Sequence, residues 1–120
     1  MRIRSIRPEF WTSTDIAALD WHTRLVYIGL WSYVDDNGVG RDVEPLITAA
    51  LFPLDGDLSE SSVRVHEGLK ALCSGGQIVR YQVAGKPYLH VVQWSKHQKI
   101  NRASEGRYPL PTSGNTIRSA

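Results

Sequence analysis

The chain has 120 residues, of which 42% are hydrophobic and 22% are charged, and this composition fits one globular domain with a single core. Its one cysteine, Cys73, excludes an intramolecular disulfide and favours a reducing compartment. The N-terminus lacks the apolar core of a signal peptide, and no apolar stretch is long enough to cross a bilayer. We therefore expect a cytoplasmic protein without a membrane partner.

The net charge of +2 conceals an uneven distribution along the chain. Residues 1–34 carry 4 basic and 3 acidic side chains, residues 35–60 carry 1 and 7, and residues 61–120 carry 9 and 2. A cationic C-terminal half is typical of a protein that binds a polyanion, and the acidic middle segment is expected to face away from phosphate. The alternative interpretation is a solvated charged surface without a partner.

The first half of the chain predicts an arm followed by helices. Arginines alternate with Ile and Ser over residues 2–7, which indicates an extended segment that ends at Pro8. A short helix is expected over 15–19. A core helix follows over 21–34, because its apolar residues, including Trp21 and Trp31, cover nearly the whole circumference. The run DDNG then predicts a turn, after which come a short strand over 39–41 and a helix over 43–51 that Asp42 caps.

The second half predicts a third main helix and a β-hairpin. Val65, Leu69 and Leu72 follow a 3.6-residue period, so the helix over 59–73 is expected to bury them and to leave its Ser, Arg and Lys positions outside. A Gly-Gly pair ends this helix. Two strands follow over 77–83 and 87–94, closed by a tight turn. On the first strand Val79, Tyr81 and Val83 are expected to pack inward, and Arg80 and Gln82 to face a ligand.

This order of elements predicts an α+β fold, a winged helix-turn-helix domain over residues 1–100. It has three main helices, a C-terminal β-hairpin wing, an N-terminal arm and a short extra helix. Residues 101–120 are rich in Lys, Arg, Ser, Gly and Pro, and we expect them to form a flexible basic tail.

A winged helix of this kind predicts a set of DNA-binding side chains. Arg64 can bond guanine with its guanidinium or contact a phosphate, and the sequence favours neither. The wing, arm and tail would add charge against the phosphate backbone, with Arg107 among the tail cations. The predicted contacts on the recognition helix are Ser59, Ser61, Ser62, Arg64, His66 and Lys70. Those on the wing, arm and tail are Arg80, Lys86, Arg2, Arg4, Lys96, Lys99 and Arg102.

Signals for catalysis, cofactors and metals are weak throughout the sequence. No Gly-rich phosphate loop follows a strand, no GxSxG motif occurs, and the four histidines and Cys73 lack paired zinc-ligand spacing. We predict that the protein is not an enzyme and that it has neither a cofactor nor a metal site.

Several segments together resemble a known family. RSIRPEFW, RLVYIGLWSYVDDNGVGRD, LFPLD, GGQIVRY and YLHVVQWSKHQKI are similar to small helix-turn-helix proteins of actinobacterial phages and prophages, and through them to the N-terminal winged-helix domain of phage replisome organisers and DnaD-type primosomal proteins. The resemblance covers about residues 1 to 102. It implies binding of double-stranded DNA in a bacterial cytoplasm, often with self-association.

The resemblance favours a role in replication initiation, with a phage transcriptional regulator as the alternative. Replisome organisers usually continue into a second domain, whereas only a short tail follows here. A homodimer and a host or phage replication protein are open as further partners. A second alternative is a winged-helix module for protein–protein interaction, in which Phe10, Trp11 and Trp94 would line the partner surface, although packing onto the core is the more common fate of such aromatics.

Overall fold

The chain forms six helices and four strands over residues 1–99, 106–111 and 116–117, the part that this computed structural model describes. The predicted main helices and strands are all present, within a few residues of their expected bounds. Helices α1 and α6 and strand β4 were not predicted. In chain order the elements are α1 Glu9–Thr12, α2 Thr14–Ala17, α3 Trp21–Tyr33, β1 Val39–Arg41, α4 Glu44–Leu51, α5 Leu58–Ser74, β2 Ile78–Val83, β3 Lys86–Val91, α6 Trp94–His97 and β4 Thr116–Ile117.

Capping side chains set the start of three of these helices. Ser13 accepts from the backbone of α2, Asp20 accepts from Thr23 N at 2.9 Å at the start of α3, and Asp57 accepts from Glu60 N at 3.1 Å at the start of α5. The prediction that Asp42 caps α4 is wrong. Val43 occupies that position without a side-chain cap, because Asp42 is buried and binds Arg80 instead.

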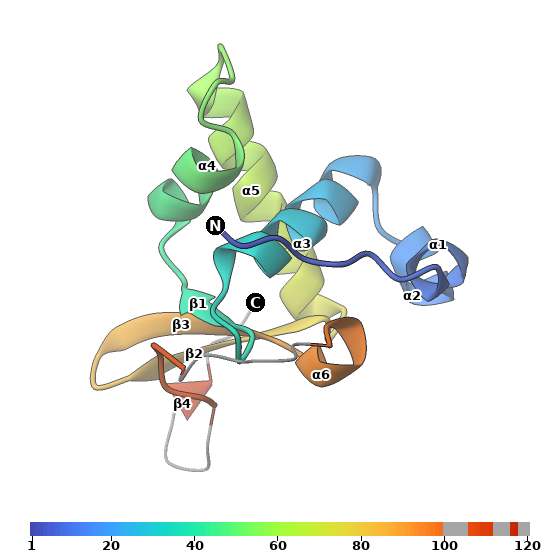
Figure 1. The fold of residues 1–120 in the computed structure, drawn as a ribbon. Coiled ribbons are helices and arrows are strands. Elements are labelled where there is room, and N and C mark those ends of the chain that lie inside the picture. The colour runs from blue at the N-terminus through green and yellow to red at the C-terminus, as the bar shows by residue number, and fades with distance from the viewer. Residues whose placement is uncertain (100–105, 112–115, 118–120) are drawn as a thin grey trace.

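The core lies where α3, α4 and α5 pack together above the sheet (Figure 1). Trp31 belongs to it, as predicted. Trp21 does not, since 83% of it is exposed. Trp21 is the first residue of α3, and Leu25, four residues later on the same face, is also exposed, so this first turn projects beyond the neighbouring helices. The main buried side chains are Phe10, Ile16, Val26, Tyr27, Leu30, Trp31, Val34, Ile47, Val65, Leu69, Leu72, Ile78, Leu89, Val91 and Trp94.

The antiparallel sheet has the strand order β1-β3-β2-β4. Its register pairs Ile78 with Val91 and Arg80 with Leu89. Ile78, Leu89 and Val91 all join the main core, and Arg80 shares their face because side chains alternate along a strand. The face prediction for this strand is therefore wrong: Arg80 points toward the helices, and the Tyr81 side points away from them.

The second face of the sheet is covered by the C-terminal segment. Tyr81 and Tyr88 form a small buried cluster with Val39, and Tyr108 packs against it. The Tyr81 hydroxyl donates to Pro109 O at 2.6 Å. The expected flexible tail is thus contradicted for residues 106–111, which lie on the domain. Residues 101–105, 112–115 and 118–120 lie outside the described part of the chain.

The N-terminal arm runs along α3 before the chain turns into α1 and α2 (Figure 1). Arg2 N donates to Ser32 O at 3.0 Å, which ties the arm to the C-terminal half of α3. Within the described residues, no helix combines the length and the apolar character needed to cross a membrane.

Candidate nucleic-acid interface

The serines of the predicted recognition helix, α5, do not share one exposed face. Ser59 and Ser62 are exposed. Ser61 is buried, and its hydroxyl donates to Asp55 Oδ2 at 2.8 Å, so its predicted DNA contact is wrong. The reason is helical geometry: Ser61 lies one turn before Val65 on the packed face of α5.

The charged side chains of α5 are mostly engaged with carboxylates. Arg64 is half-buried, with its guanidinium 3.9 Å from Glu60 and 3.6 Å from Glu67. His66 Nδ1 lies 3.0 Å from Glu44 Oε1. Lys70 is exposed and has no ion pair with any described residue. A phosphate approaching Arg64 would therefore also meet two acidic side chains, which opposes the predicted contact.

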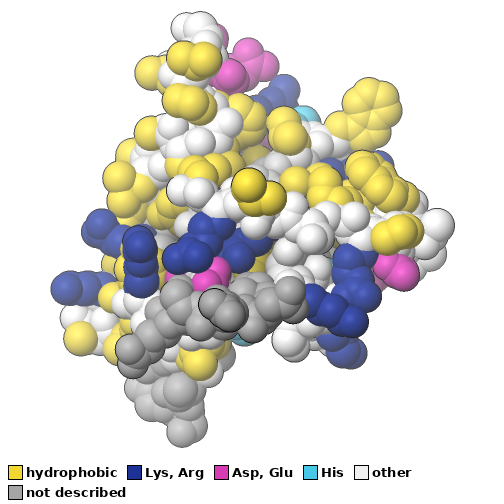
Figure 2. All heavy atoms as spheres, in the orientation of Figure 1, with side chains coloured by type: hydrophobic (Ala, Val, Ile, Leu, Met, Phe, Trp, Pro, Cys, Tyr) yellow, Lys and Arg dark blue, Asp and Glu magenta, His cyan; other side chains and the backbone are white. Residues whose placement is uncertain are grey.

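More acidic residues surround the N-terminal half of α5. Figure 2 shows Asp and Glu side chains at the tip formed by the α4–α5 loop. Lys70 is the only exposed cation of α5. This end of the molecule, which we call the acidic end, repels phosphate. Its exposed carboxylates are Asp20, Asp55, Asp57, Glu60 and Glu67.

The β2–β3 hairpin contributes one of its two predicted cations to the surface. Lys86 is exposed beside the turn. The side chain of Arg80 is only 6% exposed. It forms a bidentate ion pair with Asp42, in which Nε donates to Oδ2 at 2.7 Å and Nη2 donates to Oδ1 at 2.9 Å. Glu44 adds a contact at 3.3 Å. The predicted DNA contact of Arg80 is therefore wrong, because its charge holds β2 to the start of α4.

Burial alone would lower the pKa of Arg80, since it disfavours the charged guanidinium. The hydrogen bonds to Asp42 and the nearby charge of Glu44 outweigh burial and raise that pKa instead. Arg80 therefore stays charged and paired with Asp42 and Glu44.

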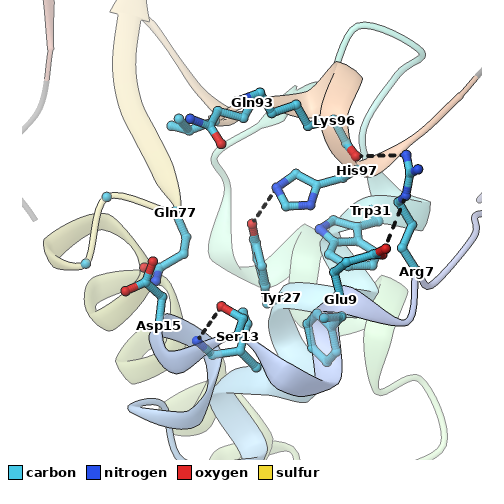
Figure 3. A pocket seen from close by; sticks show the side chains of 15 residues that line it. Arg7, Glu9, Ser13, Asp15, Tyr27, Trp31, Gln77, Gln93, Lys96 and His97 are labelled. Atoms are coloured by element: carbon cyan, nitrogen blue, oxygen red, sulfur yellow. Dashed lines mark hydrogen bonds and ion pairs between the residues drawn. The ribbon is translucent and has the colours of Figure 1, made fainter.

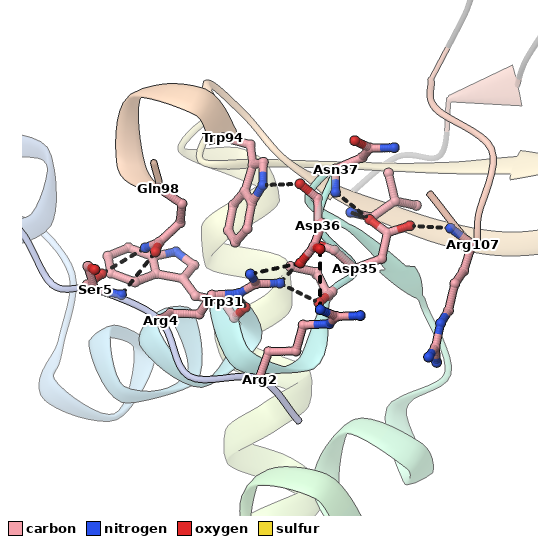
Figure 4. A network of polar contacts seen from close by, with 12 residues as sticks. Arg2, Arg4, Ser5, Trp31, Asp35, Asp36, Asn37, Trp94, Gln98 and Arg107 are labelled. Atoms are coloured by element: carbon pink, nitrogen blue, oxygen red, sulfur yellow. Dashed lines mark hydrogen bonds and ion pairs between the residues drawn. The ribbon is translucent and has the colours of Figure 1, made fainter. Parts of the chain in front are cut away.

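The arm arginines bind the acidic turn after α3 (Figure 4). Arg4 is almost fully buried: it reaches Asp36 Oδ1 at 3.1 Å and the backbone carbonyls of Trp31 and Val34 at 2.7 and 3.0 Å. Arg2 pairs with Asp36 Oδ2 at 3.2 Å. The predicted phosphate contact of Arg4 is wrong, since a buried carboxylate requires a partner and Arg4 supplies it. Arg2 keeps 44% of its side chain exposed.

Trp94 completes this network from the other side. Its indole nitrogen donates to Asp36 O at 2.9 Å, and the Arg4 guanidinium lies 4.9 Å from its ring centroid. The ring packs on Gly38, whose φ of +81° and lack of a Cβ permit the contact. Trp94 and Phe10 are both buried, so the alternative that placed them on a partner surface is wrong for these two. Trp11 remains exposed.

Exposed cations gather on the side opposite the acidic end. Figure 2 shows Lys and Arg side chains in a band over the hairpin, the arm and α6. We call its exposed cations outside the arm the cationic face, because Arg2 and Arg7 of the arm pair with Asp36 and Glu9. No member forms an ion pair with any described residue. Sequence reasoning missed Arg41, which sits in the acidic segment, and Arg102 lies outside the described residues. The cationic face consists of Arg41, Lys86, Lys96, Lys99 and Arg107.

A cleft of about 670 Å³ borders the cationic face where α6 meets α1 and α2 (Figure 3). Arg7 and Lys96 stand at this cleft, and Arg7 Nη1 donates to Lys96 O at 3.1 Å. Aromatic side chains from three elements line it. They are Phe10, Tyr27, Trp31 and His97.

The polar groups of this aromatic lining are uncharged at neutral pH. Burial raises the pKa of Tyr27 to about 12, partly offset by the side chain of Trp31. Burial lowers the pKa of His97, and its ring lies 3.4 Å from the Tyr27 hydroxyl. The buried Oε1 of Gln77 has no hydrogen-bond partner among the described residues. The cleft therefore offers an aromatic, neutral lining between charged edges.

Across residues 1–99, 106–111 and 116–117, no cluster of three or more His, Cys, Asp or Glu side chains could hold a metal ion. Comparisons with protein-family models, with curated proteins and with solved structures gave no match to this chain.

Proposed function

We propose that this chain is a winged-helix protein that binds duplex DNA, and that it does so through the cationic face. The observation that carries the proposal is the separation of charge. Exposed cations without ion-pair partners among the described residues lie over the hairpin, α6 and residues 106–111. Most exposed carboxylates of the described residues lie at the acidic end, and the exceptions, Glu9 and Asp15, line the cleft beside Lys96. Such an arrangement orients a polyanion toward one side of a protein.

The order of the elements supports the winged-helix assignment. Three helices, α3, α4 and α5, lead directly into the β2–β3 hairpin, and β1 pairs with β3 at its outer edge. In this assignment the hairpin is the wing, and Lys86 lies at its tip. In winged helices the first turns of the recognition helix usually enter the major groove, but in this chain the first turns of α5 lie within the acidic end. We infer that the wing and α6 carry most of the contact.

This mode of binding limits how well the protein can distinguish one DNA sequence from another. Lysines and arginines that contact phosphate position a protein on DNA but read no bases. On α5, Ser59, Ser62 and Lys70 are the exposed residues without a carboxylate partner that could reach base edges. We therefore expect weak discrimination between sequences and a strong dependence of affinity on salt.

The salt dependence of duplex binding tests the proposal. The quadruple variant Arg41→Gln, Lys86→Gln, Lys96→Gln, Lys99→Gln should reduce the slope of log affinity against log salt by roughly 0.9 for each phosphate that the variant no longer neutralises. The control Arg64→Gln removes a cation that already pairs with Glu60 and Glu67, and it should leave the slope nearly unchanged. Wild-type protein that fails to bind duplex even at low salt, or a control variant that loses more affinity than the quadruple variant, contradicts the proposal.

The biological role that we propose is replication initiation in a phage or prophage, which the sequence resemblance favours. A transcriptional regulator that uses the same surface is the second candidate. Mapping of bound sites on the genome separates the two roles, because clustering at an origin supports initiation and clustering at promoters supports regulation.

A further inference from the structure

A groove of about 700 Å³ opens between the first turns of α3, the α4–α5 loop and the start of α5. Large apolar side chains are exposed around it. Leu25 and Leu54 line the groove and are 55% and 95% exposed. Trp21 does not line the groove itself, but it lies one turn before Leu25 on α3 and is 83% exposed. Exposed apolar side chains that cluster in this way on a folded domain mark an interaction site more often than isolated ones do.

Carboxylates surround these apolar side chains. Asp55, Asp57 and Glu60 all line the groove, and Asp20 precedes Trp21. The one cation of the lining is Arg64, which lies between Glu60 and Glu67. The groove therefore combines exposed apolar side chains with a net negative lining.

We propose that this groove docks a cationic amphipathic helix of a partner protein. Leucine or aromatic side chains on one face of such a helix would cover Trp21, Leu25 and Leu54. Lysines and arginines that flank this face would meet the carboxylates of the lining. The charge of the groove and its exposed apolar area are thus both matched by one occupant.

The charge pattern also disfavours other occupants. A symmetric contact between two copies of the chain would bring acidic lining against acidic lining. An anionic lipid surface and nucleic acid are repelled for the same reason. The proposal does not rest on DNA binding, because the groove shares no residue with the cationic face, and the two surfaces can be occupied together.

A synthetic amphipathic helical peptide of leucine and lysine is the probe for this groove. It is titrated into the ¹⁵N-labelled full chain, and the indole N–H resonance of Trp21, identified by its loss in Trp21→Ser, reports the contact. A matched peptide with glutamate in place of lysine, and a scrambled leucine–lysine peptide that cannot form an apolar face, serve as controls. We expect saturable shifts at Trp21 and at residues of the groove with the first peptide only.

Two sets of variants assign the binding to the groove. Trp21→Ser with Leu54→Ser should weaken peptide binding at least tenfold, and Trp11→Ser, which removes an exposed tryptophan elsewhere, should not. The isosteric set Asp55→Asn, Asp57→Asn, Glu60→Gln should weaken it severalfold, whereas Glu9→Gln with Asp15→Asn should not. Asparagine retains the capping oxygen of Asp57, so α5 should still form.

Several outcomes would overturn the proposal. Equal binding of the lysine and glutamate peptides would remove the charge argument, and unchanged binding by Trp21→Ser with Leu54→Ser would place the peptide elsewhere. Concentration-dependent dimers in sedimentation that Trp21→Ser abolishes would show that a second copy covers the groove instead. Unfolding monitored by circular dichroism confirms that each variant is folded before its affinity is compared.

Discussion

The N-terminal half of α5 and the cationic face present opposite chemistry, although the sequence assigned both to DNA. On α5, Arg64 lies between Glu60 and Glu67, which offset its charge. On the cationic face, exposed cations such as Lys86 and Lys96 have no ion pair among the described residues. The difference shows that the residues around a cation in space decide whether its charge is available to a ligand. Its position in a helical sequence pattern does not.

The two regions also differ in how cations near them are used. Arg80 lies on the hairpin and Arg4 on the arm, and both side chains are buried against carboxylates from the acidic middle of the chain. They stabilise the fold, and the exposed cations remain for a ligand. Variants that separate cations that stabilise the fold from cations that can contact a ligand test the comparison directly.

The largest effect is expected at Arg80. Replacement by Met should lower the free energy of unfolding by about 3–5 kcal/mol, because it leaves the buried Asp42 without its partner. Chemical denaturation measures this loss. Lys86→Met on the neighbouring strand should change stability by less than about 0.5 kcal/mol. Similar stabilities for the two variants would mean that Arg80 is not the structural cation that we describe.

The next effect is expected at Arg4. Arg4→Met should cost about 2–3 kcal/mol of unfolding free energy, less than the loss at Arg80 because Arg2 still pairs with Asp36. It should also release the arm, which increased amide hydrogen exchange at Ser5 and at Trp94 would report. An arm that stays protected in this variant argues against the anchoring role of Arg4.

A smaller effect concerns pH. Burial lowers the pKa of His90 and His97 from the usual 6.5, so the unfolded chain binds protons more readily than the folded chain as the pH falls. The free energy of unfolding should therefore decrease from about pH 7.5 to about pH 5.5 and should level off below the folded pKa values. His97→Gln should flatten this slope. Urea titrations at each pH measure it, and a stability that rises as the pH falls through this window would contradict the sign.

The smallest effect is expected at Arg64. Arg64→Ala removes exposed pairs with Glu60 and Glu67 and should change the free energy of unfolding by less than about 1 kcal/mol. Duplex affinity should change less than twofold, because the charge of Arg64 is already offset. Filter binding or fluorescence anisotropy at low salt provides the measurement. A loss of tenfold or more would restore α5 as the main contact.

Local signals in the sequence were sufficient for most of the secondary structure. An apolar-rich run located α3, and apolar residues at a 3.6-residue period located α5. The short helices α1 and α6 were missed because one turn of helix carries little periodic signal. Their positions depend on packing of Phe10 and Trp94 into the core.

The candidate site was harder to predict, because residues that are distant in the sequence decide which of its side chains are exposed. Asp36 belongs to the predicted DDNG turn, and the sequence around it gave no sign that it is buried and bound by Arg2 and Arg4, which lie more than thirty residues away. The Arg80 face of β2 was assigned wrongly because Tyr81 found a second apolar partner, Tyr108, beyond the hairpin. Alternation along a strand shows that there are two faces but does not show which one the helices cover.

The most direct test of the central claim is to map a duplex titration on the surface of the protein by NMR. A short duplex of random sequence is added to the ¹⁵N-labelled chain, and amide shifts are compared between the two regions. We predict the largest shifts at Arg41, Lys86 and Lys96 and small shifts over the first turns of α5. The largest shifts at Ser59, Ser62 and Arg64, with little change at Lys86 and Lys96, would contradict the account.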